Sequence, residues 1–572
     1  MGNYFHRTLI VASLAAICIS AGAREISREF ITPKAVMLEE GCEHSGELLV
    51  AKSRQASLGS AGMCAMSTKN GAKASILLDF GQELQGGLEL VLGSSKPYRP
   101  ARMHICLGES VAEALSSVDE AGGTATNDHA MRDFEITVPR DGSIRVGNSG
   151  FRFARIDLVE PGQTVFVQNV SAISEMRDLP RRGSFRCSDP LLNKIWETGV
   201  RTVQLCMQDY LWDGIKRDRL IWVGDMYPEV ATIYSVFGDD PIIRESLDVV
   251  EKQFPLPNWI NGMPAYSLWY IILQDQIYRH TGDYEYLSGK LPYIKGVIAK
   301  LDESFNADGE LCLPSEFLDW PSSDNRKAVH SGTVALALKA AQTAGELASA
   351  CGDGSIGGQV AGIVSRLEAL LAGDGGQTFG NKQAAAMLGL FADKTDREIC
   401  GVIEKDGVKG FSTFYGYYML EAMAQYGNQH TLKAIEFIRK FWGGMLELGA
   451  TSFWEDFNIE WMNNAGRIDE LPVPGKVDVH GAYGNYCYKG YRHSLCHGWA
   501  SGPTAWMSSH ILGVEIINPH MVVLDPNLGD LEWAEGSVPL PEGAVEVKLT
   551  RKNDGSFSIL YDAPEDVTVM LK

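Results

Sequence analysis

Residues 188–211, SDPLLNKIWETGVRTVQLCMQDYL, mark the point at which the character of the sequence changes. Ser188-Asp-Pro190 has the form of a helix start, in which a cap residue is followed by a proline that suits the first turn. Apolar residues then recur at roughly helical spacing, namely Leu191, Ile195, Val200, Val203, Met207 and Leu211. This stretch therefore predicts a helix that opens a helical region.

Further apolar segments with helical spacing follow the first one, and glycines such as Gly238, Gly282 and Gly427 separate them. They lie near residues 227–237, 266–280, 329–350, 412–426, 430–447 and 494–512. Because almost no strand signal intervenes, residues 181–513 predict an all-α domain. Antiparallel helix pairs stacked in a ring would bury that much apolar surface.

On both sides of the helical region, short apolar runs alternate with turn residues. Residues 24–180 contain such runs at 74–81 and 87–93, which predicts an N-terminal β-sandwich domain. Residues 514–572 predict a small C-terminal β-domain, with a hairpin turn at Asn553-Asp-Gly555. We therefore expect a multidomain chain in which a helical domain lies between two β-rich domains.

The bulk composition limits the classes of partner. The 572 residues are too many for one ordinary core, and the formal net charge is −21. An acidic chain without a Lys/Arg block repels phosphate backbones, so we expect no nucleic-acid partner. Neutral sugars and small molecules are compatible with this charge. The oligomeric state is left open.

The N-terminus predicts a signal peptide over residues 1–23. His6 and Arg7 precede an apolar run at 9–18, and Ala21-Gly-Ala23 has the small-residue pattern of a cleavage site. That run is too short to span a bilayer, and we expect no stable membrane insertion elsewhere. We expect cleavage after Ala23 and export to the periplasm or the medium. The alternative interpretation is a buried N-terminal strand.

The cysteines do not form a recognisable motif. Eleven occur, ten of them after the expected cleavage, and there is no CxxC pair, so a zinc or redox motif is not indicated. Export permits disulfides, but spacing does not reveal pairing. Buried free thiols are at least as well supported as bridges. We expect no metal ion and no cofactor.

One stretch, residues 213–229 (DGIKRDRLIWVGDMYPE), concentrates carboxylates, cations and a tryptophan. Pro228 suits the first turn of the helix at 227–237, so Asp225 lies just before a helix N-terminus, where the dipole favours its ionised form. The charges before it lie on a loop, where binding groups concentrate. The alternative is a solvated loop with ion pairs, which the presence of Trp222 and Gly224 among the charges disfavours.

Two other segments pair carboxylates with tryptophan, namely Trp454-Glu455 and Asp319-Trp320, and His497 and Trp499 lie at the start of the last helical segment. Indole faces stack on sugar rings and carboxylates bond sugar hydroxyls, although a single tryptophan is more often a core residue. No serine-hydrolase, P-loop or zincin motif occurs. Glycoside hydrolysis needs only two suitably placed carboxyl groups.

In this order the motifs resemble those of the bacterial α-L-rhamnosidases, glycoside hydrolase family 78 in the six-hairpin glycosidase superfamily. The similarity runs from about residue 70 to the C-terminus and includes residues 78–82, 150–153 and 185–193. The family's catalytic stretch has the form Asp-Cys-Pro-x-Arg-Glu-(x)3-Trp-x-Gly-Asp. The matching positions here are Asp213, Arg217, Trp222 and Asp225. Trp454-Glu455 resembles the motif of the general base, and His497 matches a sugar-binding histidine.

The resemblance implies an (α/α)6 barrel and cofactor-free inverting hydrolysis that removes terminal α-L-rhamnose, or a related sugar, from plant or algal glycans or glycosides. It implies Asp218 as the general acid and Glu455 as the base. The implied substrate-binding residues are Asp213, Arg217, Trp222, Asp225, Asp319, Trp320, Trp454 and His497.

The sequence departs from the family at the general acid, which is usually Glu and here is Asp218. The carboxyl is withdrawn by about 1.5 Å, and a misplacement of about 1 Å can cost on the order of 100-fold in rate. Either the loop has moved inward, or Glu229 takes the role, or activity is altered or lost. The alternatives are a carbohydrate-binding protein on an inactive scaffold, or a related barrel enzyme for another sugar, including a lyase with a Tyr227, Tyr266 or His497 base.

Overall fold

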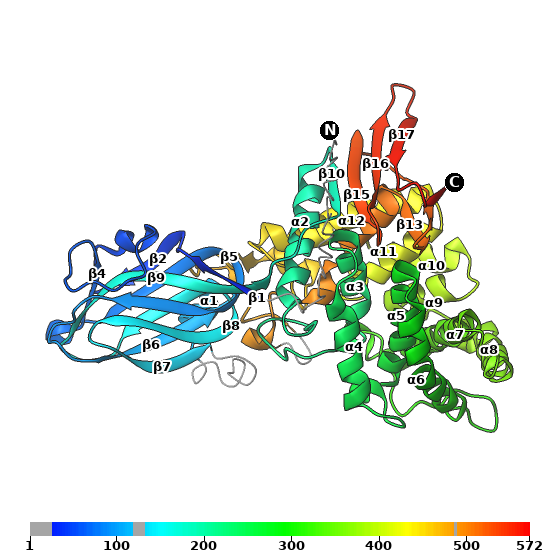
Figure 1. Ribbon diagram of the computed structural model, residues 1–572, viewed down its shortest axis with the longest axis horizontal. Coiled ribbons are helices and arrows are strands. Elements are labelled where there is room, and N and C mark those ends of the chain that lie inside the picture. The colour runs from blue at the N-terminus through cyan, green and yellow to red at the C-terminus, as the bar shows by residue number, and fades with distance from the viewer. Residues whose placement is uncertain (1–25, 118–131, 485–488) are drawn as a thin grey trace, which may run out of the picture.

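The structure, a computed structural model, describes residues 26–117, 132–484 and 489–572. A β-rich N-terminal part lies at one end of the long axis, and the helices lie at the other (Figure 1). The predicted signal peptide at 1–23 lies outside the described residues. Within the described ranges, no helix combines the length and apolar character needed to cross a membrane.

The N-terminal part is a nine-stranded antiparallel sheet with the path β3-β4-β9-β5-β8-β6-β7, on which β1 pairs with β9 and β2 with β5. The strands are β1 (Ile26–Ile31), β2 (Ala35–Glu40), β3 (Cys42–Glu43), β4 (Cys64–Ser67), β5 (Ala74–Leu92), β6 (Ala101–Gly108), β7 (Asp133–Val138), β8 (Gly142–Leu158) and β9 (Thr164–Arg177). The predicted β-rich character of this region is therefore confirmed. The sheet encloses a hydrophobic core of its own.

The two runs predicted as separate strands at 74–81 and 87–93 form one long strand, β5. Its pairing with β8 shifts register between Asp79 and Leu84. Gly81 lies in this irregularity with φ +84°, a backbone conformation that glycine adopts without a Cβ penalty. The glycine that indicated a turn in the sequence therefore bends the strand without ending it.

Twelve α-helices lie between residues 190 and 506 of the described chain. They are α2 (Pro190–Cys206), α3 (Met226–Val236), α4 (Pro241–Gln253), α5 (Pro264–Thr281), α6 (Tyr284–Asp302), α7 (Arg326–Ala350), α8 (Gly357–Ala372), α9 (Lys382–Phe391), α10 (Asp396–Ile403), α11 (Gly416–Gln425), α12 (Asn428–Glu447) and α13 (Pro503–Trp506). The predicted helical region and its first helix are confirmed: Asp189 caps α2 by accepting from Leu191 N, and Pro190 begins it.

Alternate helices pack against one another through the helical region. Helix α3 contacts α5, α5 contacts α7, α7 contacts α9, and α9 contacts α11. Helix α13 contacts both α11 and α3, and α12 contacts α2. These contacts bury a continuous core that includes Trp269, Trp442 and Trp506.

The helix predicted at 494–512 begins later than expected. Residues 494–497 are not helical, a short 3-10 turn covers Gly498–Ser501, and α13 then continues into a π-helical segment at Met507–Ile511. The non-helical stretch is hydrogen-bonded to residues 453–455 through Ser494 O and His497 N. Tertiary pairing therefore takes residues 494–497 out of the helix that their spacing predicted.

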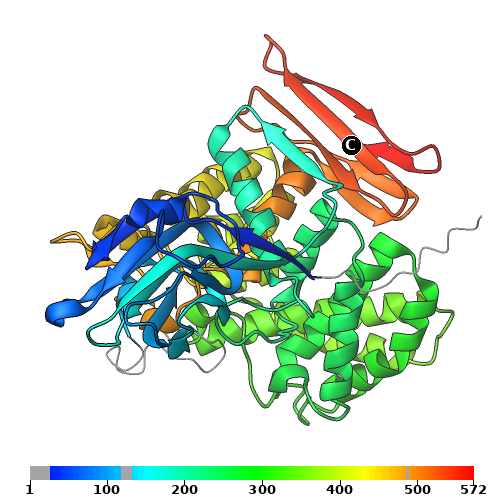
Figure 2. The same cartoon turned by 60° about the vertical axis from the view of Figure 1, so that its left-hand side comes forward.

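The C-terminal strands form two small sheets, β10-β15-β16-β17 and β13-β14-β18. Their bounds are β10 (Ser184–Cys187), β13 (Val514–Asn518), β14 (Met521–Leu524), β15 (Trp533–Pro539), β16 (Ala544–Arg551), β17 (Phe557–Asp562) and β18 (Thr568–Leu571). The tail is β-rich as predicted, and its hairpin turn falls at 552–556. Strand β10, from the start of the helical region, pairs with β15, and the tail shares the helical core (Figure 2).

Two smaller features complete the fold. Strands β11 (Ala465–Gly466) and β12 (Val477–Asp478) form a two-stranded pair, and α1 (Val111–Leu115) follows β6. The nine cysteines in the described ranges are free thiols, six of them buried, while Cys487 lies outside those ranges.

Candidate active site

Three segments that are distant in the sequence meet at one place in the helical region: the loop after α2, residues 453–455 and residues 494–498. Gly498 N donates to Asp213 O at 2.7 Å, and His497 N donates to Phe453 O at 2.9 Å. Glu455 N donates to Ser494 O at 2.9 Å. Main-chain hydrogen bonds therefore hold the candidate residues of all three segments together.

Glu455 is buried, and each of its two carboxylate oxygens accepts a hydrogen bond. It is 3% exposed, its Oε1 accepts from Arg217 Nη2 at 2.5 Å, and its Oε2 accepts from Ser494 N at 3.0 Å. Burial raises the pKa of Glu455, but Arg217, together with the nearby histidines and the Ser494 N–H, outweighs burial and leaves this pKa below its usual value. A buried carboxylate that stays ionised is suited to accept a proton.

Asp218 lies on the loop after α2, and the backbone of this loop is unusual. Asp218 and Arg219 both have left-handed conformations, with φ of 58° and 53°. Such positions in non-glycine residues cost free energy and cluster at functional sites. The loop is closed at its base because Asp213 Oδ1 accepts from Leu220 N at 2.9 Å and Asp213 N donates to Leu220 O at 3.0 Å.

Arg217 links the two candidate catalytic carboxylates. Its Nη2 lies 2.5 Å from Glu455 Oε1 and 3.8 Å from Asp218 Oδ2. The two carboxylate oxygens can therefore be no further apart than these two distances together. The Asp218 side chain is 20% exposed, whereas that of Glu455 is 2% exposed. The structure thus brings Asp218, Glu455 and Arg217 into one site.

Asp213 and Asp225 are buried carboxylates beside this pair. Asp225 accepts from Tyr266 Oη at 2.8 Å and lies 3.4 Å from His497 Nε2. We expected the N-terminus of α3 to favour the ionised form of Asp225. Its side chain makes no capping bond, and burial raises its pKa instead. Burial also raises the pKa of Asp213 well above its usual range, with the charges of Asp218 and Asp225 adding to the effect.

Aromatic rings extend the site away from the carboxylates. Trp222 meets Tyr266 edge to face at 6.1 Å, Tyr266 meets Phe317 at 6.4 Å, and Phe317 meets Trp320 at 5.2 Å. Trp222 and Trp320 remain half-buried. Gly224 is required in this row, because a Cβ there would lie 2.1 Å from the Tyr266 ring.

Asp319 lies next to this aromatic row but is enclosed by protein groups. It accepts from Ser412 Oγ at 2.5 Å and from Gln383 Nε2 at 3.3 Å, and it is 2% exposed. Burial raises its pKa to about 6. In this structure Asp319 therefore anchors the start of the turn that carries Trp320.

Two residues raised by the sequence are placed differently from expectation. Trp454 is fully buried against Phe457 and His493, so it packs as a core residue and presents no ring face to a sugar. Glu229, the alternative general acid, is 1% exposed and packs against Gly498, where a Cβ would lie 1.9 Å from its Oε1. Of the three candidate catalytic carboxylates, Glu455 and Asp218 are the two that lie within 4 Å of Arg217.

Lys216 is a positioning residue that the sequence analysis did not single out. Its Nζ lies 2.9 Å from Glu109 Oε2 and 3.2 Å from Glu113 Oε1, and it donates to Tyr491 O and His493 O at 2.8 and 2.7 Å. Both glutamates are contributed by the N-terminal domain, at and before α1. Lys216 thereby ties that domain to the residue directly before Arg217.

The same network reaches the base. Glu109 Oε2 accepts from Leu495 N at 2.7 Å, next to the Ser494 N–H that bonds Glu455. Burial raises the pKa of Glu109 to about 7, against the opposing charge of Lys216. Of these residues, only Lys216 lay in a stretch that the sequence marked, at a position where the family motif allows any residue. The role of Glu109 depends on contacts nearly 400 positions apart in the chain.

Comparisons with known proteins identify the family of this chain. A model of the bacterial alpha-L-rhamnosidase 6 hairpin glycosidase domain matches residues 180–511, more than half of the chain. No curated relative matches the chain at a significant level.

Several solved structures share the fold. A GH78 family rhamnosidase of Bacillus sp. GL1 superimposes with a TM-score of 0.72 at 21% identity, covering 92% of this chain and 55% of that one. A rhamnosidase from Klebsiella oxytoca with rhamnose bound gives 0.64 at 18%, covering 85% and 96%. A Streptomyces avermitilis α-L-rhamnosidase complexed with L-rhamnose gives 0.66 at 16%, covering 91% and 50%.

This chain therefore spans about half the length of the Bacillus and Streptomyces enzymes and nearly all of the Klebsiella one. The helical region that carries the candidate site is the region that the family model matches. The chain belongs to the bacterial α-L-rhamnosidase family of six-hairpin glycosidases.

Proposed function

We propose that this protein is an exported, inverting glycosidase that removes terminal α-L-rhamnose, or a closely related sugar, from plant or algal glycans or glycosides. The observation that carries the proposal is the placement of Asp218 and Glu455 at one site, both within reach of Arg217. The rhamnose and L-rhamnose bound to the Klebsiella and Streptomyces enzymes support the choice of sugar.

In the proposed reaction Asp218 donates a proton to the glycosidic oxygen as the bond from this oxygen to the anomeric carbon breaks. Glu455 accepts a proton from the water that attacks the opposite face of the anomeric carbon. The low pKa of Glu455 suits the base role. We assign the acid role to Asp218 and not to Glu229, because Glu229 is buried and packs against Gly498, whereas Asp218 is partly exposed and lies 3.8 Å from Arg217 Nη2.

The remaining site residues bind the sugar in this proposal. Asp213, Asp225 and His497 provide buried polar groups for its hydroxyls, and the half-buried Trp222 and Trp320 provide ring faces. The proposed site has no place for Trp454.

The proposed architecture is an (α/α)6 barrel. The contacts from α3 through α5, α7, α9 and α11 to α13, and from α13 back to α3, support an inner ring of six helices. The proposed domains are residues 24–180, 181–513 and 514–572 after a signal peptide at 1–23. N-terminal sequencing of the exported form should find Arg24 as the first residue, and an intact Met1 would contradict export by this route.

The stereochemistry of the product tests the mechanism. The two Arg217 contacts set an upper bound on the distance between Asp218 Oδ2 and Glu455 Oε1 that lies just below the ~6.5–9.5 Å of inverting glycosidases. This bound also admits the ~5–5.5 Å of retaining enzymes, so the product has to decide between the two mechanisms. Proton NMR during hydrolysis of an aryl α-L-rhamnoside should show β-L-rhamnose before mutarotation. Initial α-L-rhamnose would contradict inversion. Binding without release of sugar, across α-L-rhamnosides and plant and algal oligosaccharides, would instead support a carbohydrate-binding protein with a disabled Asp218.

A further inference from the structure

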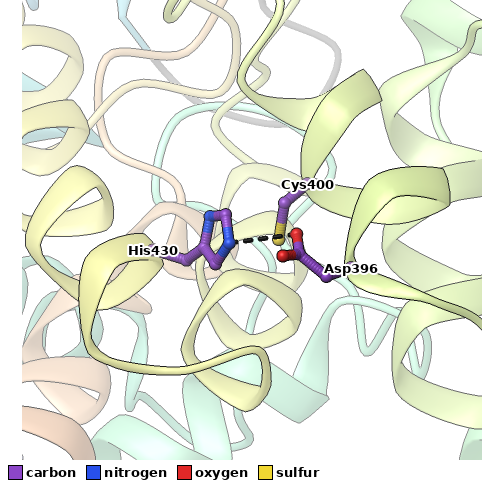
Figure 3. A group of neighbouring side chains, drawn as sticks. All are labelled: Asp396, Cys400 and His430. Carbon is purple, nitrogen blue, oxygen red and sulfur yellow. Dashed lines mark ion pairs between the residues drawn. The ribbon is translucent and has the colours of Figure 1, made fainter.

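A second cluster of titratable side chains lies on α10 and α12, two helices that carry none of the candidate active-site residues. Asp396 and Cys400 are one turn apart on α10, and His430 lies in the first turn of α12. One possible donor atom from each lies within 4.8 Å of the others. In Figure 3 the thiol and the carboxylate lie side by side and face the imidazole ring across the gap between the two helices.

We propose that Asp396, Cys400 and His430 bind a divalent cation of the zinc class. A thiolate, an imidazole and a carboxylate are the three ligand types that Zn²⁺ takes in proteins. The sulfur and nitrogen donors disfavour Mg²⁺ and Ca²⁺, which prefer all-oxygen sites. The cation would join α10 to α12.

The local sequence builds the two halves of this site. Thr395 caps α10 in a reciprocal box with Glu398, which fixes where the helix begins. Residues four apart on a helix project from the same face, so Asp396 and Cys400 both point toward α12. Two well-defined helices therefore present the donors, and no long loop has to be ordered on binding.

The second ring nitrogen of His430 provides an independent indication. His430 Nδ1 is bonded to the carboxylate of Glu404 at the C-terminal end of α10, while its Nε2 faces Asp396 Oδ1 at 3.0 Å. Histidines that bind metals usually have the other ring nitrogen held by a carboxylate or a carbonyl, which orients the ring. Glu404 occupies that outer position for a metal at Nε2.

The Nε2 side of the His430 ring is bordered by two polar side chains, those of Gln429 and Asp396. Gln429 Nε2 also lies 3.0 Å from His430 Nε2, and Asp396 has a side chain that is 50% exposed. Both groups can move to admit an ion, whereas Cys400 and His430 are buried and fixed. In the described ranges, His430 is the one ion-pair partner of Asp396 and of Glu404.

The other group of possible ligands, Glu109, Glu113 and His480, differs in this respect. The Lys216 ammonium lies 2.9 to 3.2 Å from all three side chains, so the protein itself supplies the cation there. The cluster on α10 and α12 is therefore the one of the two that is suited to an external metal ion.

Cobalt binding to the metal-stripped full-length protein tests this site. Titration with Co²⁺ should give a thiolate-to-cobalt charge-transfer band that saturates at one ion per chain, and Zn²⁺ should displace it. Cys400→Ser should abolish the band. Cys312→Ser, which removes an exposed thiol, should leave it unchanged. No band in the unmodified protein, or an equal band in Cys400→Ser, would overturn the proposal.

Affinity measurements test the outer carboxylate and guard against misfolding. Glu404→Gln should weaken Zn²⁺ binding by about 10–100-fold, as expected for a partner of a metal-bound histidine. Asp396→Asn, at a half-exposed position, should also weaken it, with circular dichroism confirming the fold. His520→Gln, which alters an exposed histidine paired with Asp566, should not change it. Affinities unchanged in both site variants would overturn the proposal, and kcat/KM should not change in any of them.

Discussion

The two candidate catalytic carboxylates, Glu455 and Asp218, are held in position by different means. Glu455 is buried and is fixed by an arginine, a main-chain N–H and the surrounding segments. Asp218 is partly exposed and stands on a loop with two consecutive left-handed residues. The base is thus preorganised by tertiary contacts, and the acid by local backbone geometry. The position of the proposed acid is also where the sequence departs from the family, which usually has Glu where this chain has Asp218.

Removing the base should give the largest effect. Glu455→Gln keeps the shape of the side chain but removes the proton acceptor, so kcat should fall by about 10²–10⁴-fold for every leaving group. Steady-state kinetics on aryl and natural α-L-rhamnosides would measure this. Glu460→Gln, five positions along on the exposed surface and paired with Lys409, should have no effect. An unchanged kcat in Glu455→Gln would remove this residue from the mechanism.

Substitutions of Asp218 should have effects that depend on the leaving group of the substrate. Asp218→Asn should lower kcat on natural glycosides by up to about 10²–10⁴-fold, because their leaving groups need a proton. Aryl glycosides with good leaving groups should be affected far less. Asp218→Glu tests whether the position of the carboxyl group is set for the shorter side chain. If the loop is adapted to aspartate, the longer side chain should lower activity. Equal loss on both substrate types in Asp218→Asn would argue against the acid role.

Lys216 links the loop after α2 to Glu109 and Glu113 of the N-terminal domain, so its removal should lower the free energy of unfolding substantially. Lys216→Met removes the only lysine partner of the buried Glu109 in the described ranges, while Glu113 keeps its ion pair with Arg132, and breaking a buried ion pair in this way costs about 3–5 kcal/mol. Denaturant unfolding should show the loss. Lys290→Met removes a lysine from the partly exposed carboxylates of Asp248 and Glu251, where pairs contribute about 0–1 kcal/mol. Equal losses in the two variants would contradict the assigned role of Lys216.

The smallest expected effect is a shift in pH dependence. Burial raises the pKa of Glu455 and Arg217 opposes it, so Arg217→Gln should raise this pKa. The base must be ionised, and activity is lost as pH falls through its pKa. The acidic limb of kcat/KM should therefore move to higher pH in this variant. Arg219→Gln, on the same loop but bonded to Gln85 and Asn148, should leave the limb in place.

Sequence reasoning missed five helices of the helical region, α4, α6, α8, α9 and α10, and two of them contain residues that are read as helix breakers. Helix α6 contains Pro292, and α8 contains Gly357, Gly358 and Gly362. In the folded protein, α6 and α8 pack along α7, and this burial outweighs the poor propensity. The reverse occurred at residues 494–497, where helical spacing was present but pairing with residues 453–455 was favoured.

The tryptophans show the same limit within the site. Trp222 and Trp454 each lie beside charged residues, and their local sequences do not distinguish a binding surface from a core. Trp222 is half-buried beside Tyr266, whereas Trp454 is completely enclosed. Exposure depends on what the rest of the chain packs against each ring, and neighbouring letters do not carry this information.

The sequence by itself determined the β-helical-β order, the first helix with its cap, and the charged stretch that contains Asp213, Arg217, Asp218 and Asp225. These features depend on propensity, periodicity and motif spacing, all of which act over a few residues. Only the tertiary structure decided that Arg217 bridges Asp218 and Glu455 and that Lys216 anchors the loop to Glu109. Electrostatic pairs and burial act through space, and the partners here are separated by up to a few hundred positions in the chain.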